Sequence, residues 1–247
     1  MSDDVMPSLQ TLRSRFLQRR HTTLLVAIVI LFAVRPLIGE GQTGPVLFSV
    51  ALIVLMLVAL YTVQIDELAG EREVLLRRKR RHNMLGWVLA ALAAVERVAV
   101  LSSPTRQTSL VGSVCWLLFF GFVTWSQFRS LLKQKEITSE SISLSISVYL
   151  LLALSWGLLY IVIFEYQPEA FSLGGSSPTS GGQSTFAVLI YFSLTTLSTI
   201  GFGDITPLTL QSRYAAVAEG ITGQFYLAIL VARLVGMQMS QSASNRA

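Results

Sequence analysis

The stretch Thr199-Ile200-Gly201-Phe202-Gly203-Asp204 lies between an apolar, threonine-rich run and a long apolar segment, and it decides the fold. Glycine adopts positive φ at little steric cost. Gly201 and Gly203 therefore let a short extended segment turn successive carbonyls toward one axis. Such a row of carbonyl oxygens can replace the hydration shell of a cation. We interpret the stretch as an ion selectivity filter, in preference to a glycine turn between two helices.

The composition indicates a membrane protein. The chain of 247 residues is 52% hydrophobic and only 13% charged, with a mean hydropathy of +0.59, unlike an ordinary soluble domain. Its single cysteine, Cys115, excludes an intrachain disulfide and supports no cysteine metal site. Basic residues that flank membrane spans explain the net charge of +5, so nucleic acid is not an expected partner. No Ser/His/Asp set, metal-ligand cluster or nucleotide loop points to an enzyme.

Apolar runs close to the ~20 residues that cross a bilayer predict six transmembrane helices. These runs lie at 22–38, 44–63, 84–101, 107–128, 142–164 and 208–237. The apolar run 185–197 is too short to cross, so it is predicted to be a re-entrant pore helix surrounded by protein. Thr206-Pro207 is predicted to cap the last span. The expected fold class is therefore an all-α membrane protein.

Lysine and arginine predict the orientation. Basic residues gather before the first span, after the second and after the fourth, whereas the loops between these positions have almost none. These residues are Arg13, Arg15, Arg19, Arg20; Arg72, Arg77, Arg78, Lys79, Arg80, Arg81; and Arg129, Lys133, Lys135. Such loops stay in the cytoplasm. We expect a multi-pass protein of the plasma (inner) membrane with both termini cytoplasmic and the 199–204 segment facing outside.

The 199–204 segment and its surroundings resemble the pore of potassium channels, whose signature is Thr-Val-Gly-Tyr-Gly-Asp. The run 191–198 precedes the segment and Ile205-Thr206-Pro207 follows it. Ile200 and Phe202 replace the valine and tyrosine of the signature, as in variants of that family. The resemblance is to prokaryotic channels of the six-transmembrane, one-pore-loop type, and it covers about the last hundred residues. It implies K+ as the permeant ion and no cofactor.

The resemblance also implies a role for single residues. It assigns K+ coordination to the carbonyls of Thr199, Ile200, Gly201 and Phe202 and to the Thr199 hydroxyl, and Gly203 ends the filter.

The residues that support the filter in this resemblance are Tyr191, Phe192, Thr195, Thr196, Ser198 and Asp204. Tyr191 and Phe192 match an aromatic pair around the filter, and Asp204 matches an aspartate behind its outer mouth. Thr195 replaces a glutamate that couples to that aspartate in several relatives. Because Phe202 lacks a phenolic hydroxyl, we expect packing to hold the filter more than hydrogen bonds.

The chain has one copy of the filter motif, so the resemblance implies a homotetramer with four copies around one axis. Residues 142–237 form the expected pore domain, with the filter at 199–203. Residues 22–128 form a peripheral, voltage-sensor-like four-helix bundle. The remaining parts are a basic N-terminal segment (1–21), a cytoplasmic linker (129–141) and a short cytoplasmic tail (238–247).

Gating by a voltage sensor is not expected, because the fourth span, 107–128, has no basic residue. Each charge moved through 100 mV supplies only ~2.3 kcal/mol, so several arginines are needed. Glu96 and Arg97 in the third span receive no assigned role. Lipids, membrane tension, pH and a constitutively open pore remain as alternatives.

Three residues of the last span are candidates for a gating hinge: Glu219, Gly220 and Gly223. Gly220 is the preferred hinge, with close helix packing as the alternative. Glu219 is an intramembrane carboxyl and hence a functional candidate that faces the cavity or a neighbouring subunit.

The basic run Arg77-Arg78-Lys79-Arg80-Arg81 is explained by topology, with contact to anionic lipid headgroups as the alternative. Two other functions remain for the whole chain. One is a channel-like potassium transporter subunit, although such proteins carry four pore units and usually single-glycine filters. The other is a non-conducting regulatory membrane protein, against which the intact 199–204 segment argues.

Overall fold

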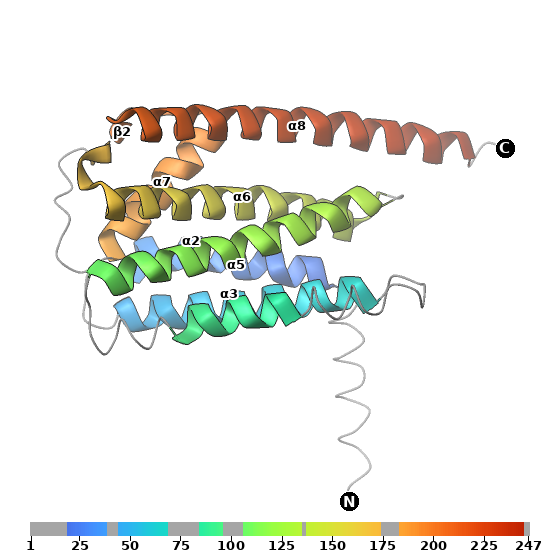
Figure 1. Ribbon diagram of the computed structural model, residues 1–247. Coiled ribbons are helices and arrows are strands. Elements are labelled where there is room, and N and C mark those ends of the chain that lie inside the picture. Colours follow the sequence, from blue (N-terminus) through green and yellow to red (C-terminus); the bar gives the residue numbers. More distant parts are fainter. Residues whose placement is uncertain are drawn as a thin grey trace, which may run out of the picture.

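The structure is a computed structural model that describes residues 19–38, 44–68, 84–95, 106–134, 137–173 and 183–244. The predictions for the basic run 77–81, for Glu96 and Arg97 and for the first 18 residues lie outside these ranges. The described chain is mostly helical, as predicted (Figure 1). The helices are α2 (Arg20–Ile38), α3 (Gly44–Leu68), Met84–Val95, α5 (Arg106–Lys133), α6 (Ser139–Tyr166), α7 (Gln183–Leu197) and α8 (Leu210–Ser244).

Three of the described helices are long and apolar enough to cross a membrane: Ser109–Lys133, Ser139–Tyr166 and Leu210–Met239. Shorter apolar helices lie at Arg20–Ala33, Ser49–Gln64, Met84–Val95 and Thr185–Leu197. The last of these is α7, which has 15 residues. At ~1.5 Å per residue it is about 22 Å long, shorter than a hydrocarbon core of ~30 Å. Six complete spans remain a prediction.

Helix α6 is the element on which the others assemble. It packs against α2, α5, α7 and α8, and Figure 1 shows α8 on one side of α6 and α3 on the other. Thr138 caps α6, because its side chain accepts from the Ser141 backbone N–H while the Ser141 hydroxyl accepts from the Thr138 backbone N–H. Helix α6 is therefore the common scaffold of α2, α5, α7 and α8.

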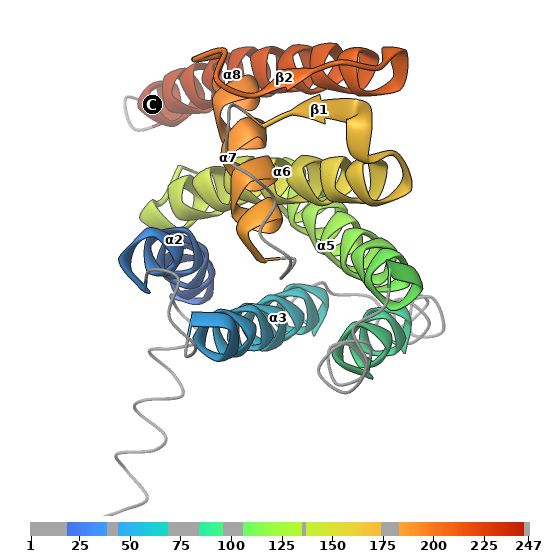
Figure 2. The same cartoon turned by 90° about the vertical axis from the view of Figure 1, so that its left-hand side faces the viewer.

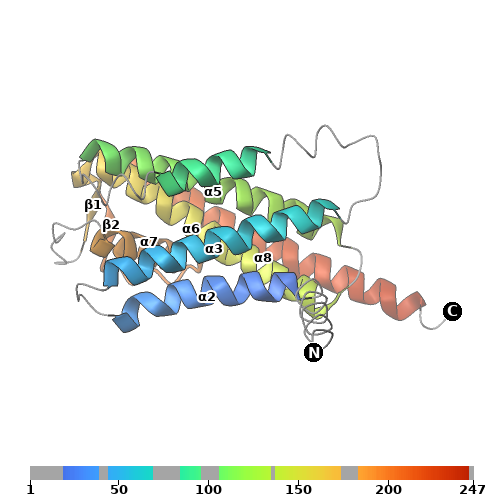
Figure 3. The ribbon, with the colours of Figure 1, turned by 90° about the horizontal axis from the view of Figure 1, so that it is seen from below.

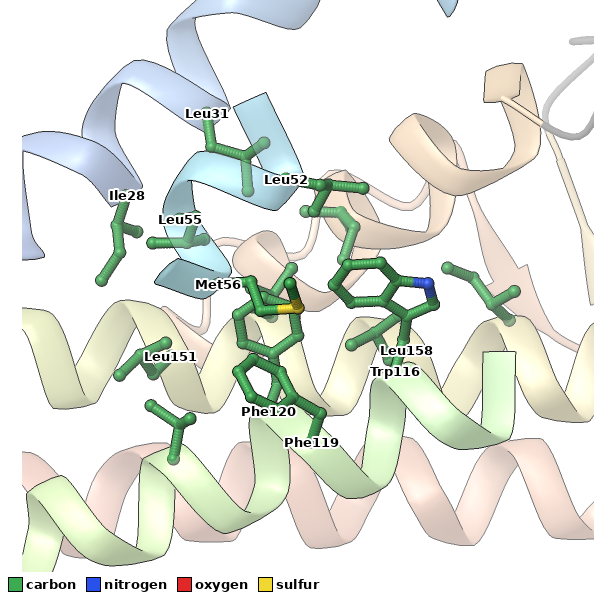
Figure 4. Close-up of a cluster of buried hydrophobic side chains, with 14 of the residues drawn as sticks. Ile28, Leu31, Leu52, Leu55, Met56, Trp116, Phe119, Phe120, Leu151 and Leu158 are labelled. Atoms are coloured by element: carbon green, nitrogen blue, oxygen red, sulfur yellow. The ribbon is translucent and has the colours of Figure 1, made fainter. Parts of the chain in front are cut away.

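A large hydrophobic cluster joins α2, α3 and α5 to α6 (Figure 4). The rings of Trp116, Phe119 and Phe120 on α5 pack on one another with centroid separations of 5.2–6.4 Å. Around them lie Ile28, Leu31, Leu52, Leu55, Met56, Leu151 and Leu158. Lipid tails are as apolar as these side chains, so close van der Waals packing stabilises the contact inside a bilayer.

Polar contacts also join the helices at both ends of α6. At its first turn, Glu140 accepts hydrogen bonds from the His21 backbone N–H at 3.0 Å and from the Thr22 hydroxyl at 2.5 Å. At its last turn, Glu165 accepts from the Ser109 hydroxyl of α5 at 2.5 Å. The start of α2 therefore lies beside the start of α6, and the start of α5 beside the end of α6.

We predict that Gly157→Ala destabilises the protein, because a Cβ at residue 157 of α6 would lie 2.4 Å from Ile190 Cδ1 and 3.1 Å from its Cα on α7. Overpacking of this kind costs about 1–3 kcal/mol. Gly121→Ala is the matched control, since a Cβ there meets nothing within 4 Å. Thermal unfolding of purified protein should show a lower Tm for G157A alone. Equal Tm values would contradict the close approach of α6 and α7.

Candidate ion pathway

The 199–204 segment follows the end of α7 and has an alternating backbone. Thr199, Gly201 and Gly203 have φ values of 60°, 53° and 80°, whereas Ile200 and Phe202 are not in the positive range. Alternation between left-handed and ordinary conformations turns successive carbonyls toward the same side. Positive φ was expected at the glycines. At Thr199 it was not, because a β-branched residue rarely adopts it.

Hydrogen bonds fix the start of this segment to the last turn of α7. The backbone N–H of Thr199 donates to the Thr196 carbonyl at 3.0 Å, and that of Gly201 donates to the Thr195 carbonyl at 3.2 Å. The Ser198 hydroxyl donates to the Leu194 carbonyl at 2.6 Å. The left-handed conformation of Thr199 is thus held by its neighbours, as strained residues require.

The aromatic pair 191–192 separates, with one ring on each side of α7. The Tyr191 ring stacks on Phe202 with centroids 6.4 Å apart and planes at 3°. Phe192 points the other way and packs on Tyr160 and Phe171 at 5.1 and 5.6 Å. One ring therefore supports the 199–204 segment, and the other attaches α7 to α6.

The Asp204 carboxyl interacts with Tyr191 and with the backbone of the next residue. It accepts from the Ile205 N–H at 3.0 Å. Partial desolvation and a hydrogen bond to Asp204 raise the pKa of the Tyr191 phenol. The Thr195 hydroxyl instead donates to the Phe192 carbonyl at 2.9 Å. The hydroxyl of Thr195 is thus bonded within α7, and the Tyr191 phenol is the group that senses the Asp204 carboxyl.

A short strand pair holds the end of the segment, and it corrects the predicted cap. Thr206–Pro207 form β2, which pairs antiparallel with β1 (Phe171–Ser172), and α8 begins only at Leu210. The residue that caps α8 is Thr209, whose hydroxyl accepts from the Ser212 N–H at 3.4 Å. The prediction failed because the backbone at 206–207 is extended and paired with a strand 35 residues earlier. Figure 3 shows this pair at the end of the molecule opposite the C-terminal end of α8.

The Ala170 carbonyl, at the end of the 3-10 turn Pro168–Ala170, connects the strand pair to α8. It accepts from the Leu208 N–H and from the Ser212 hydroxyl, both at 2.8 Å. Figure 2 shows α7 extending from α8 across α6, with these strands beside its upper end. The 199–204 segment is therefore held at both ends by other elements of the chain.

Glu219 does not face open space in the single chain. Its side chain is 0% exposed, and its carboxyl lies 2.5 Å from the hydroxyls of Tyr160 on α6 and Ser193 on α7. Sequence analysis missed both partners. The sequence does indicate that Glu219 needs polar neighbours, because it is a carboxyl inside a membrane protein. The local sequence does not indicate which hydroxyls contact it, because these lie 59 and 26 residues away along the chain.

Helix α8 continues without a break through both candidate hinge glycines. A Cβ at residue 223 would lie 2.3 Å from the Leu197 carbonyl oxygen, whereas one at residue 220 meets only the Thr196 carbonyl at 4.0 Å. Gly223 therefore allows close packing of α8 against the end of α7. The Tyr149 hydroxyl donates to the same Leu197 carbonyl at 3.2 Å.

The 199–204 segment is exposed on the single chain. The side chains of Ile200 and Phe202 are 58% and 69% exposed. A stripe of large apolar side chains on α8 is exposed as well; it consists of Leu210, Tyr214, Val217, Ile221 and Phe225. Their spacing of three or four residues puts them on one face of the helix. This face of α8 and the side chains of Ile200 and Phe202 are apolar surfaces that a single chain leaves uncovered.

Comparison with known proteins agrees with this arrangement. A family model described as an ion channel matches residues 148–239. The "Potassium channel protein kcv" of Paramecium bursaria Chlorella virus 1 is 31% identical over 72 residues, which are 29% of this chain and 77% of that protein. No solved structure matches the chain significantly.

Two further relatives are each named "Protein LctB". The protein of Bacillus caldotenax is 28% identical over 103 residues, covering 40% of this chain and 74% of its own length. That of Geobacillus stearothermophilus is 25% identical over 118 residues, covering 48% and 87%.

The helices, the alternating segment after α7 and these matches define a membrane ion channel rather than an enzyme. Within that class, the chain belongs to the potassium channel family.

We predict that Gly223→Ala impairs ion flux and Gly220→Ala does not. The added methyl at 223 would displace the Leu197 carbonyl, two residues before the alternating segment, whereas the methyl at 220 has room. Ion flux into liposomes and thermal unfolding should both be affected in G223A only. Impaired flux in G220A with an unchanged G223A would instead support the hinge predicted at Gly220.

Proposed function

We propose that the chain forms a homotetrameric, potassium-selective channel that conducts K+ passively across the membrane. The carbonyls of Thr199, Ile200, Gly201 and Phe202 coordinate the ion, together with the Thr199 hydroxyl. Gly203 ends the filter, and no cofactor takes part. The observation that carries the proposal is the alternation of positive φ at residues 199, 201 and 203 directly after a helix too short to span.

This backbone suits a dehydrated cation. Carbonyl oxygens that face one side replace water around the ion. A pore helix that points its C-terminal end at the same region adds partial negative charge there. Both terms favour a cation, and the likeness to a viral protein named as a potassium channel supports K+ as that cation.

One chain supplies only one row of carbonyls, so the proposal requires several copies around an axis. The exposed side chains of Ile200 and Phe202 and the apolar stripe on α8 are the surfaces that neighbouring copies would cover. Four copies would surround the ion with four rows. Closed rotational symmetry is the usual solution for identical chains.

The proposed orientation has both termini in the cytoplasm of the plasma (inner) membrane and the filter outside. The distribution of lysine and arginine supports it. The contacts between helices are compatible with this orientation. The starts of α2 and α6 meet at Glu140. Arg233, in the second half of α8, donates to the carbonyls of Leu132 and Gln134 at 2.9 and 2.6 Å. We propose membrane lipids as the other partners.

Voltage is not the proposed stimulus. Helix α5 has no arginine between Arg106 and Arg129, and the Arg129 guanidinium lies 4.9 Å from the centroid of the Trp125 ring. A cation stacked on an aromatic ring at the end of a helix serves as an anchor.

Flux of K+, Rb+ and Na+ into proteoliposomes tests the proposed function. We expect passive K+ and Rb+ uptake and exclusion of Na+. Uptake that requires a coupled ion would support the transporter alternative, and no uptake would support a non-conducting protein.

We predict that Gly201→Ala abolishes K+ selectivity. Space is not the reason, since a Cβ at 201 meets nothing within 4 Å in the chain. The reason is φ of +53°, which costs an alanine about 1–2 kcal/mol in each subunit. The filter segment would relax and its carbonyl would turn away. Gly236→Ala is the control, because it has open space in ordinary helix. Unchanged K+ over Na+ preference in G201A would contradict the filter assignment.

A further inference from the structure

A chain of hydrogen bonds at Glu219 joins α6, α7 and α8 outside the ion pathway. The Tyr160 hydroxyl lies 2.5 Å from Glu219 Oε2, and the Ser193 hydroxyl lies 2.5 Å from Glu219 Oε1. The same Ser193 oxygen lies 2.6 Å from the Ala153 carbonyl of α6. We call Tyr160, Glu219, Ser193 and the Ala153 carbonyl the Glu219 relay. It runs from α6 through α8 and α7 and returns to α6.

The relay contains three oxygen–oxygen contacts, and each needs one proton. The Tyr160 and Ser193 hydroxyls supply one proton each, and the Ala153 carbonyl supplies none. An ionised Glu219 also supplies no proton, so one of the three contacts would bring two oxygen atoms together without a proton between them. A neutral Glu219 supplies the third proton by donating from Oε1 to Ser193. Ser193 is then free to donate its own proton to the Ala153 carbonyl.

The charges around the relay also favour the neutral form. Helices α6, α7 and α8 contain four other charged residues: Glu140, Glu165, Arg213 and Arg233. Glu140 accepts from α2 and Glu165 from Ser109. Arg213 donates to the Pro207 carbonyl, and Arg233 donates to the carbonyls of Leu132 and Gln134. The phenols of Tyr160 and Tyr149 are the titratable groups that α6 turns toward Glu219. The one titratable group of α7, Tyr191, stacks on Phe202 instead.

An unpaired carboxylate in such a place is strongly unfavourable, because its charge has lost water without gaining a cation. A buried carboxylic acid that stays neutral and donates a hydrogen bond avoids this cost. The oxygen–oxygen distances and the surrounding charges therefore both indicate that Glu219 is neutral.

We propose that Glu219 is a positioning residue whose proton holds the pore helix α7 between α6 and α8 in the conducting arrangement. When the proton leaves, Ser193 has one proton for two acceptors. The carboxylate is the stronger acceptor, so the bond from Ser193 to Ala153 is lost and α7 is released from α6. Ser193 precedes Thr199 by six residues, and the loss of this bond changes the base of the filter. This proposal rests on the proposed channel function.

Infrared spectroscopy tests the proton directly and without any ion flux. Purified full-length protein in a detergent that has no ester groups should show the C=O stretching band of a protonated carboxylic acid near neutral pH. The band should decrease as pH rises and be absent in Glu219→Gln. A band that persists in E219Q, or none in the wild type, overturns the proposal.

Ion flux at a series of pH values tests the consequence. Glutamine reproduces the neutral acid, because its amide donates to Ser193 while its oxygen accepts from Tyr160, yet it does not titrate. We expect wild-type K+ flux to fall as pH rises, since the neutral fraction falls tenfold per unit above the midpoint. E219Q should conduct at every pH. Glu169→Gln, an exposed carboxyl near the strand pair, should follow the wild type.

A second variant covers the case in which E219Q does not fold. Ser193→Ala keeps the carboxyl and breaks the relay, so we expect lower flux at every pH and no pH response. Identical pH profiles for wild type and E219Q, or for wild type and S193A, overturn the proposal. If the wild type itself does not conduct, the channel function fails, and the infrared band alone decides the protonation of Glu219.

Discussion

Backbone that leaves the helical ladder inside a bilayer finds no water for its polar groups, and this constraint explains what surrounds residues 198–209. The segment is attached at one end to the last turn of α7 and at the other to β1 and the Ala170 carbonyl. Packing of Tyr191 on Phe202 supports its middle. Only a segment held in this way can keep Thr199 at a φ of 60°. Helices α6 and α8 position α7 so that these contacts form.

The same constraint explains the small and polar residues of α5, α6 and α8. Gly157 and Gly223 let α7 approach α6 and α8 closely, and small residues serve this purpose in membranes. Hydroxyls within apolar helices bond to carbonyls or to one another; Thr124 and Ser155, for example, join α5 to α6 at 3.0 Å. Close approach therefore replaces the hydrophobic driving force that water would supply.

The sequence was informative where a local pattern has one physical meaning. The glycine alternation predicted positive φ at 201 and 203, and the length of the run 185–197 predicted a short helix. It was uninformative where partners come from far along the chain. Thr206-Pro207 has the composition of a helix cap, yet pairing with Phe171–Ser172 makes it a strand. Glu219 stands out as an intramembrane acid, but its partners, Tyr160 and Ser193, are defined only by the packing of three helices.

In the proposed tetramer, symmetry would make the Glu219 relay more than a local contact. All its members belong to one chain, so a tetramer would contain four equal relays that do not share residues. A filter formed by four chains needs each pore helix in place. If any released helix disrupts it, the conducting fraction varies as the fourth power of the fraction of neutral Glu219. Four separate protons would then produce a steeper pH response than a single carboxyl, although no relay contacts another.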